Sequence, residues 1–429
     1  MDSIDDLIAQ IAERGYLNGL RHAALSLEYQ PKDMLPQSTI VGKNADYAIY
    51  ETTFLTPDAL RCIAAKHKTP FYLYNGSSLK YAAERIAGYL STVGEAHPYV
   101  SARYCIHPLI VQTLSDCGYG FRCESEKELD YICGCGVPGS KIRYASAVVS
   151  EAVCKRLRDM DAILVLGTDT NLPHILPRKV DLISCDAAAS NKIVKESRFT
   201  DCRFGFNAVE LAHIAAFLRT FGAESFGLTI HTEDPVQNPD FYGAKLYSVA
   251  VTAGDVYLRS KLWFDRFDVE NGYAMDYDRS ERLMEQCVIN SLKVVKEGYK
   301  EMTQSLHFCV DARLLAPQAI FLTSVVGKYM QDQSIVIVNA NASDLCSKEL
   351  KKNGTVSLVG REWAEDRSEY KVAGLRMSQD DILKQKVMLR APEIGDLMLF
   401  HDVGIAMPSH PEHPLLWYMD DGSVNELTV

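Results

Sequence analysis

The sequence lacks the features that mark secreted, membrane and nucleic-acid-binding proteins. Its first residues, Met1 to Asp6, are acidic and carry neither the basic segment nor the apolar core of a secretory signal. The most apolar late stretch, 306–330, is interrupted by charged residues and is too polar to span a membrane. Lysine and arginine are dispersed in a chain of net charge −11, whereas nucleic-acid binders cluster them. We therefore expect a cytoplasmic protein with no nucleic-acid or membrane partner.

Cysteine is present but lacks the spacing of a zinc site. The chain has 12 cysteines, and the pair Cys133 and Cys135 is followed by no second Cys or His pair at zinc-finger distance. In a chain of 429 residues without a secretory signal, such cysteines are typically reduced and buried. We predict no metal site and no disulfide framework. This length exceeds the ~250–300 residues at which single cores stop growing, so we expect two domains.

Short apolar strands alternate with amphipathic helices from residue 70 onward, which is typical of parallel β/α units. No glycine-rich dinucleotide-binding turn follows the first strand, and both faces of the strands look apolar, so an α/β fold with a (β/α)8 TIM-like barrel is favoured over an open sheet. Nine candidate strands compete for eight barrel places, so one must lie outside. These are 71–75, 99–104, 120–123, 142–146, 162–167, 181–186, 226–231, 264–270 and 308–312.

The helical rhythm stops after Pro317, and the chain turns to strands at 335–338, 355–359, 370–372, 386–389 and 397–400. This pattern predicts a C-terminal mainly-β domain. The predicted organisation is an N-terminal helical arm (1–35), strands that pair with the β-domain (36–55), the barrel (56–317) and the β-domain (318–429).

The functional side chains of such barrels lie at the carboxyl ends of the strands. Three of those positions carry arginine: Arg103, Arg122 and Arg313. Like charges held close together repel one another unless an anion neutralises them. The sequence therefore predicts an anionic ligand at this end of the barrel.

Several motifs follow one another along residues 54–410. They are Thr69-Pro-Phe-Tyr-Leu-Tyr, Gly118-Tyr-Gly-Phe-Arg-Cys-Glu-Ser-Glu-Lys-Glu128-Leu, Arg203-Phe-Gly205, Gly227-Leu-Thr-Ile-His231, Phe267-Asp-Val-Glu-Asn-Gly272-Tyr, Asp311-Ala-Arg313 and Gly395-Asp-Leu-Met-Leu-Phe-His-Asp-Val-Gly404. In their order and spacing they resemble the fold-type III pyridoxal-phosphate (PLP) enzymes, the family of ornithine and diaminopimelate decarboxylases with an alanine-racemase-like barrel. The resemblance implies amino-acid decarboxylation, PLP as cofactor and a homodimer.

The departures from the family pattern fall on the cofactor site. Arg103 stands where the family has the lysine that forms a Schiff base with PLP, and a guanidinium, which stays protonated, cannot form that bond. Val310 replaces the glutamate that pairs with the pyridine nitrogen. The phosphate-binding triple glycine becomes Glu270-Asn271-Gly272. Met377 and Ala406 replace the Cys and Tyr of the late motifs, of which the Cys is contributed by the partner subunit of the dimer. PLP is therefore disfavoured as a cofactor.

Two sets of residues are the candidate site. His231, which stacks on the cofactor ring in the family, would supply acid-base chemistry together with Glu233 or Asp234. A ligand would contact Arg103, Arg122, Arg313, Glu270, Asn271, Gly272, Asp186 and Cys185. Structural roles remain open for several of them: His231 as a packing residue, Arg122 and Arg313 in ion pairs with Asp186 or Glu270, and Glu128 as a helix-start carboxylate.

Three hypotheses for function remain open. The chain binds or transforms a small anionic amino-acid-like metabolite without covalent PLP. Alternatively, it is a non-catalytic binding or regulatory subunit, a pseudoenzyme. Third, it is a true PLP-dependent decarboxylase that uses a displaced lysine. Whether the protein is an enzyme is left open by the sequence.

Overall fold

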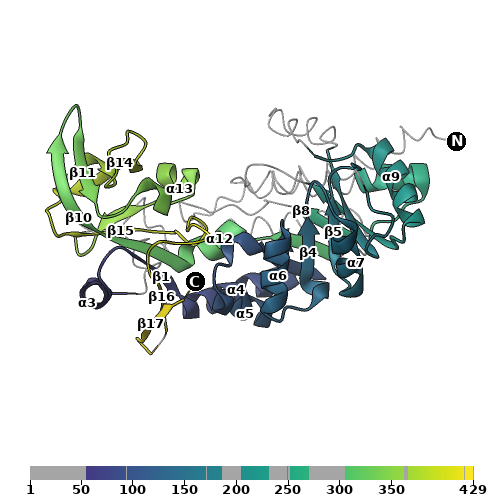
Figure 1. Ribbon diagram of the computed structural model, residues 1–429, viewed down its shortest axis with the longest axis horizontal. Coiled ribbons are helices and arrows are strands. Elements are labelled where there is room, and N and C mark those ends of the chain that lie inside the picture. Colours follow the sequence, from purple (N-terminus) through teal and green to yellow (C-terminus); the bar gives the residue numbers. More distant parts are fainter. Residues whose placement is uncertain are drawn as a thin grey trace, which may run out of the picture.

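A computed structural model gives the architecture of the protein (Figure 1). It describes residues 55–92, 94–170, 172–185, 204–230, 249, 252–269, 305–361, 366–419 and 421–428. The predicted N-terminal arm and nearly all of the 36–55 strands lie outside these ranges. In Figure 1 a barrel ringed by helices lies on one side and a β-sheet domain on the other.

Eight parallel strands close into a barrel, as the sequence predicted. Each strand pairs with its neighbour in the chain, and β9 closes the ring against β2, with Ala96 opposite Leu306. Parallel strands of this kind place all their carboxyl ends at one rim. The strands are β2 (Ala96–Ser101), β3 (Gly120–Cys123), β4 (Ile142–Ala145), β5 (Ile163–Leu166), β6 (Lys179–Ser184), β7 (Ser225–Ile230), β8 (Arg266–Val269) and β9 (Ser305–Cys309).

Amphipathic helices cover the outside of the barrel, and polar side chains cap their first turns. Ser125 Oγ accepts from Glu128 N at 3.3 Å, and Asn207 with Glu210 forms a capping box. Thr56 caps the helix that begins at Pro57, with Ala59 N donating to its Oγ1. The helices of the barrel are α4 (Gly76–Ser91), α5 (Pro108–Asp116), α6 (Glu126–Gly134), α7 (Glu151–Asp159) and α9 (Ala208–Thr220). The helix α3 (Pro57–His67) lies instead on the β-domain, where Leu60 and Ile63 belong to the same buried cluster as Phe71 and Leu322 (Figure 1).

The strand at Phe71–Asn75 (β1) is the ninth candidate, and it lies outside the barrel. It pairs antiparallel with β10 (Ala319–Met330) and parallel with β16 (Leu415–Tyr418). The first strand that the sequence places among the barrel units therefore belongs to the second sheet.

The β-domain is built around β10, a strand that sequence periodicity missed. Its first five residues are buried and its end is exposed, so it shows no strict alternation. The sequence also missed β16, β17 and a short helix, α13. The remaining elements are β11 (Ser334–Val338), β12 (Val356–Leu358), β13 (Arg367–Ala373), β14 (Ile382–Arg390), β15 (Leu397–Phe400), β17 (Val424–Leu427) and α13 (Lys348–Asn353).

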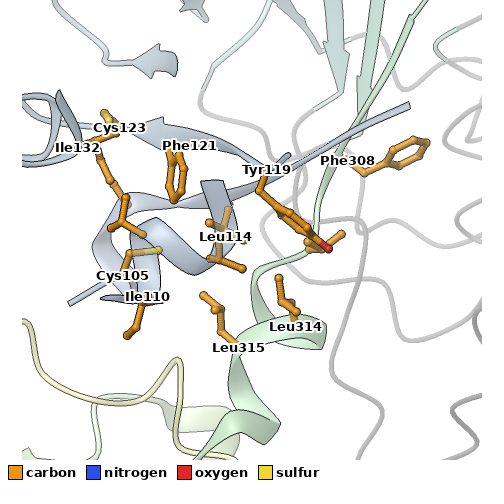
Figure 2. Packing of buried hydrophobic residues seen from close by; sticks show 14 of the residues in the cluster. Cys105, Ile110, Leu114, Tyr119, Phe121, Cys123, Ile132, Phe308, Leu314 and Leu315 are labelled. Atoms are coloured by element: carbon orange, nitrogen blue, oxygen red, sulfur yellow. The ribbon is translucent and has the colours of Figure 1, made fainter. Parts of the chain in front are cut away.

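A short helix, α12 (Asp311–Leu315), follows β9 directly, whereas the sequence extended the strand to residue 312. Its Leu314 and Leu315 belong to the same buried cluster as Leu114 of α5 and Phe121 of β3, and Figure 2 shows these side chains gathered beside the barrel wall. The packing of α12 against α4 and β2 fixes the chain where it leaves β9. That point is also the rim of the barrel.

The second barrel strand, β2, ends earlier than predicted. It stops at Ser101, and residues Ala102–Tyr104 form a single 3-10 turn closed by Cys105 N donating to Ala102 O at 2.9 Å. Arg103 therefore lies in a tight turn just beyond the strand. Its side chain leaves the barrel at the carboxyl-terminal rim.

Candidate functional site

Two of the predicted arginines meet at the rim of the barrel through a carboxylate that the sequence did not single out. Arg122, near the end of β3, and Arg103, just after β2, both pair with Glu124. Arg103 Nη1 lies 3.4 Å from Glu124 Oε2, and Arg122 Nη2 lies 3.3 Å from Glu124 Oε1. Arg122 is ion-paired, as one interpretation of the sequence held, and its partner among the described residues is Glu124; Asp186 and Glu270, the partners suggested by the sequence, lie outside the described residues.

Arg103 also packs on the neighbouring aromatic ring. Its guanidinium carbon lies 4.7 Å from the centre of the Tyr104 ring, a cation–π distance. Burial opposes the charge of Arg103, but Tyr104, Glu124 and Asp311 outweigh it and raise the pKa of Arg103. The contacts with Tyr104 and Glu124 that position the guanidinium therefore also favour its protonated form.

Asp311, at the start of α12, joins β9 to β2. Its Oδ1 accepts from Ser101 N at 2.6 Å, and its Oδ2 accepts from Ser101 Oγ at 2.5 Å. Burial raises the pKa of Asp311, although the bonds from Ser101 and the charge of Arg103 act in the opposite direction. Asp311 thus anchors the residue that immediately precedes the Arg103 turn.

The other predicted residues fall in two groups. Arg313 is buried on α12, two residues beyond Asp311, and Cys185 is exposed directly after β6, where its N–H donates to Phe206 O at 3.1 Å. Glu128 accepts from Glu124 N through Oε2 at 2.6 Å, so it holds the loop between β3 and α6, in keeping with a structural role. The remaining candidates lie outside the described residues: His231, Glu233, Asp234, Glu270, Asn271, Gly272 and Asp186.

A buried charge network fills the barrel interior below this rim, and sequence reasoning missed it. Arg143 of β4 donates through Nη2 to Asp181 of β6 and to Asp268 of β8, both at 2.7 Å. Arg266 Nε donates to Asp181 Oδ1 at 3.0 Å, and Tyr99 OH donates to Asp268 Oδ2 at 3.0 Å. The strands were expected to be apolar on both faces. On their inner face, β4, β6 and β8 instead carry matched charges.

Gly227 of β7 provides the room for this network. A Cβ atom at Gly227 would lie 2.1 Å from Asp181 Oδ1, far inside contact distance. The glycine in the Gly227-Leu-Thr-Ile motif is therefore explained by the buried carboxylate beside it. No side-chain periodicity could have indicated this, because the two residues lie on neighbouring strands 46 residues apart in the chain, 227 minus 181.

Comparison with known proteins places the chain in a family. A family model described as pyridoxal-dependent decarboxylase, C-terminal sheet domain, matches residues 71–404. The chain belongs to the pyridoxal-dependent decarboxylase family. This match confirms the resemblance to ornithine and diaminopimelate decarboxylases that the sequence motifs indicated.

Individual relatives of this decarboxylase-family chain are distant in sequence. Protein TabA of Pseudomonas amygdali pv. tabaci is 20% identical over 347 residues, covering 79% of this chain and 81% of TabA. A diaminopimelate decarboxylase variant from Helicobacter pylori complexed with L-lysine has a TM-score of 0.71 at 16% identity, covering 86% of this chain and 95% of its own. The arginine decarboxylase of Paramecium bursaria Chlorella virus has a TM-score of 0.69 at 18% identity, covering 84% and 100%. At such identities the structural likeness establishes the shared fold.

The family implies PLP, so the residues at the rim can be compared with what that cofactor needs. Arg103, two residues after the end of β2, is in ion-pair contact with a carboxylate, and no described barrel strand ends in a lysine. Val310, fully buried before α12, offers no acid to a ring nitrogen. The described residues therefore do not fit covalent attachment of PLP. Within those residues, no helix is long and apolar enough to cross a membrane, and no cluster of three or more His, Cys, Asp or Glu side chains could hold a metal ion.

Proposed function

We propose that this chain is a diverged member of the decarboxylase family that binds, and in an active form transforms, a small anionic amino-acid-like metabolite at the barrel rim. One observation carries the proposal: Arg103 and Arg122 converge on the single carboxylate of Glu124 at the carboxyl ends of β2 and β3. Paired guanidiniums are well suited to bind carboxylate groups. The ligand set keeps Arg313 with Arg103 and Arg122, and His231 with Glu233 or Asp234 remains the proposed acid-base group.

The proposal excludes a Schiff base between Arg103 and PLP. A guanidinium does not lose its proton in the accessible pH range, and the contacts of Arg103 with Glu124 and Tyr104 favour its charged form further. A stabilised positive charge on Arg103 suits an anion-binding site, whereas a nucleophile would have to lose its proton. A homodimer, which the family resemblance implies, and a cytoplasmic location are part of the same proposal.

Absorbance spectroscopy tests the cofactor part of the proposal. Purified protein is mixed with PLP, and its spectrum is recorded before and after borohydride treatment and removal of free PLP. We expect no cofactor absorbance to remain fixed to the protein at a single site. A cofactor band fixed stoichiometrically to one lysine would establish the alternative, a PLP enzyme with a displaced lysine.

Thermal unfolding against a ligand panel tests the binding part. We expect one or more amino acids or phosphorylated metabolites to raise the unfolding temperature of the wild type, and this shift to be lost in Arg103→Ala. Arg390→Ala is the matched control, because Arg390 pairs with Asp366 at 3.6 Å on the surface of the β-domain. An equal ligand shift in all three proteins would show that Arg103 takes no part in binding.

The non-catalytic alternative also has an observation in its favour. Glu124 already supplies a carboxylate to both arginines, as expected of a rim in which ion pairs replace the ligand. A wild type that shows no shift with any compound of the panel, yet associates as a stable oligomer, would favour this regulatory or pseudoenzyme role.

A further inference from the structure

The contacts of Glu124 are longer than those of a permanent ion pair. Its two oxygens lie 3.4 Å from Arg103 and 3.3 Å from Arg122. Charge-assisted N–H···O bonds are normally about 2.7–2.9 Å long, and the pairs of Arg143 inside the same barrel are 2.7 Å. Each oxygen of Glu124 faces a different guanidinium, so one planar carboxylate spans both. The rim therefore holds a carboxylate in a bridging position without holding it tightly.

The Glu124 side chain can also rotate away from the two arginines without unfolding the strand and the helix on either side of it. It lies between the end of β3 at Cys123 and the start of α6 at Glu126, and 35% of its side chain is exposed. The backbone at this point is fixed independently, because Glu124 N donates to Glu128 Oε2 at 2.6 Å and Ser125 caps α6. Rotation of the Glu124 side chain toward solvent would break neither the strand nor the helix.

We propose that Glu124 is a built-in competitor that occupies the position of the ligand's carboxylate, and that the ligand binds by exchanging its own planar carboxylate for it. This rests on the proposed function and narrows it to a substrate class, in which a carboxylate rather than a phosphate meets Arg103 and Arg122. Exchange of one carboxylate for another leaves the local charge and the planar two-oxygen geometry unchanged.

A phosphate group fits this arrangement less well. Its tetrahedral oxygens do not reproduce the in-plane pair that Glu124 presents to the two guanidiniums, and its second negative charge adds repulsion. The carboxylates of Asp311 and the displaced Glu124 would both lie nearby, since Asp311 and Glu124 both act on the charge of Arg103. Carboxylate ligands are therefore favoured by shape and by charge.

The competitor role predicts a gain of affinity on removing the charge of Glu124. Exposed ion pairs typically contribute ~0.2–1 kcal/mol each, so losing two of them from the free site should tighten ligand binding by about 2- to 30-fold. A structural or ligand-contacting carboxylate would have the opposite effect. Loss of Glu124 would then weaken binding.

Isothermal titration of the full chain with L-glutamate and with O-phospho-L-serine tests this proposal, because both probes share the amino-acid backbone and differ in the acid group. The proteins are wild type, Glu124→Gln, Glu124→Ala and the control Glu126→Gln, an exposed glutamate two residues along the chain. We expect L-glutamate to bind both Glu124 variants about tenfold more tightly than wild type, with a smaller gain for O-phospho-L-serine and no change in the control.

The outcomes separate this inference from the function on which it rests. Binding of L-glutamate that is unchanged or weaker in both Glu124 variants overturns the competitor role while leaving an anion site in place. A gain for O-phospho-L-serine equal to or larger than that for L-glutamate overturns the carboxylate assignment. Failure of the wild type and both variants to bind either probe overturns the inference, and a panel-wide lack of ligand shifts in the wild type overturns the proposed function as well.

Discussion

Replacing Arg143 with methionine should destabilise the barrel far more than removing an equivalent arginine from the surface. Arg143 Nη2 serves Asp181 and Asp268 at once, both at 2.7 Å, and all three side chains are at most 3% exposed. Without it, Asp181 keeps Arg266 and Asp268 keeps Tyr99 OH, but the described network retains two carboxylates and only one of its two guanidiniums. Removing one partner of a buried ion pair typically costs about 3–5 kcal/mol. We expect Arg143→Met to lower the free energy of unfolding by about 3–5 kcal/mol.

The matched control is Arg259→Met. Arg259 pairs with Asp255 at the same 2.7 Å, but its side chain is 41% exposed. Exposed pairs contribute about 0–1 kcal/mol, so Arg259→Met should lose far less stability than Arg143→Met, whose two pairs are buried. The measurement is the midpoint of urea unfolding followed by far-ultraviolet circular dichroism, which reports on the helices around the barrel.

A second variant tests whether charge balance, rather than packing, is the cause. Arg143→Met combined with Asp268→Asn leaves Arg266 opposite Asp181, and the amide oxygen introduced by the second substitution could still accept from Tyr99 OH. The double variant should recover at least about 1 kcal/mol of the loss, because it no longer buries an uncompensated carboxylate. A loss in Arg143→Met no larger than in Arg259→Met, or a double variant less stable than Arg143→Met, would refute the reasoning.

Two further perturbations probe the same interior. Gly227→Ala should lower the free energy of unfolding, measured with urea, by about 1–3 kcal/mol because its methyl group would meet Asp181. Gly88→Ala on α4, whose methyl group would meet nothing within 4 Å, should raise the free energy of unfolding by about 0.5–1 kcal/mol. Equal effects of the two substitutions would contradict this. Burial, followed by the charges of Arg143, His97, Arg266 and Lys141, lowers the pKa of His307, so the unfolded chain takes up a proton near pH 6.5 while the folded protein does not. Stability is then lost as the pH falls below about 6.5, and His307→Gln should flatten that decline; an unchanged pH profile would contradict the prediction.

Local chemistry made the barrel predictable from the sequence. Caps such as Ser125 and Asn207 start α6 and α9 between the barrel strands, and the short apolar strands end within a few residues of the predicted points. The β-domain was less predictable, since β10 is buried at one end and exposed at the other as it crosses from one neighbour strand to the next. The burial pattern of β10 depends on which strands pair with it, and the sequence of β10 alone does not reveal those strands.

The residues of the candidate site also differ in whether the sequence could predict them. Arg103 and Arg122 could be found because the carboxyl ends of barrel strands form one rim, a rule that needs no knowledge of contacts. Glu124 could not, because a glutamate before a helix is ordinarily a solvated or capping residue. Its role is visible when Arg103, 21 residues earlier in the chain, is brought beside it.

The interior network and the rim are mechanically connected through β2. Side chains two residues apart on a strand point to the same face, so Tyr99, which donates to Asp268, lies one layer below Ser101, which is held by Asp311. Ser101 is followed at once by the turn that carries Arg103. The bond from Tyr99 to Asp268 therefore ties β2 to β8 across the barrel interior, in addition to the backbone pairing of β2 with β3 and β9. An apolar interior would fill the same space without this directional bond beneath the turn that carries Arg103.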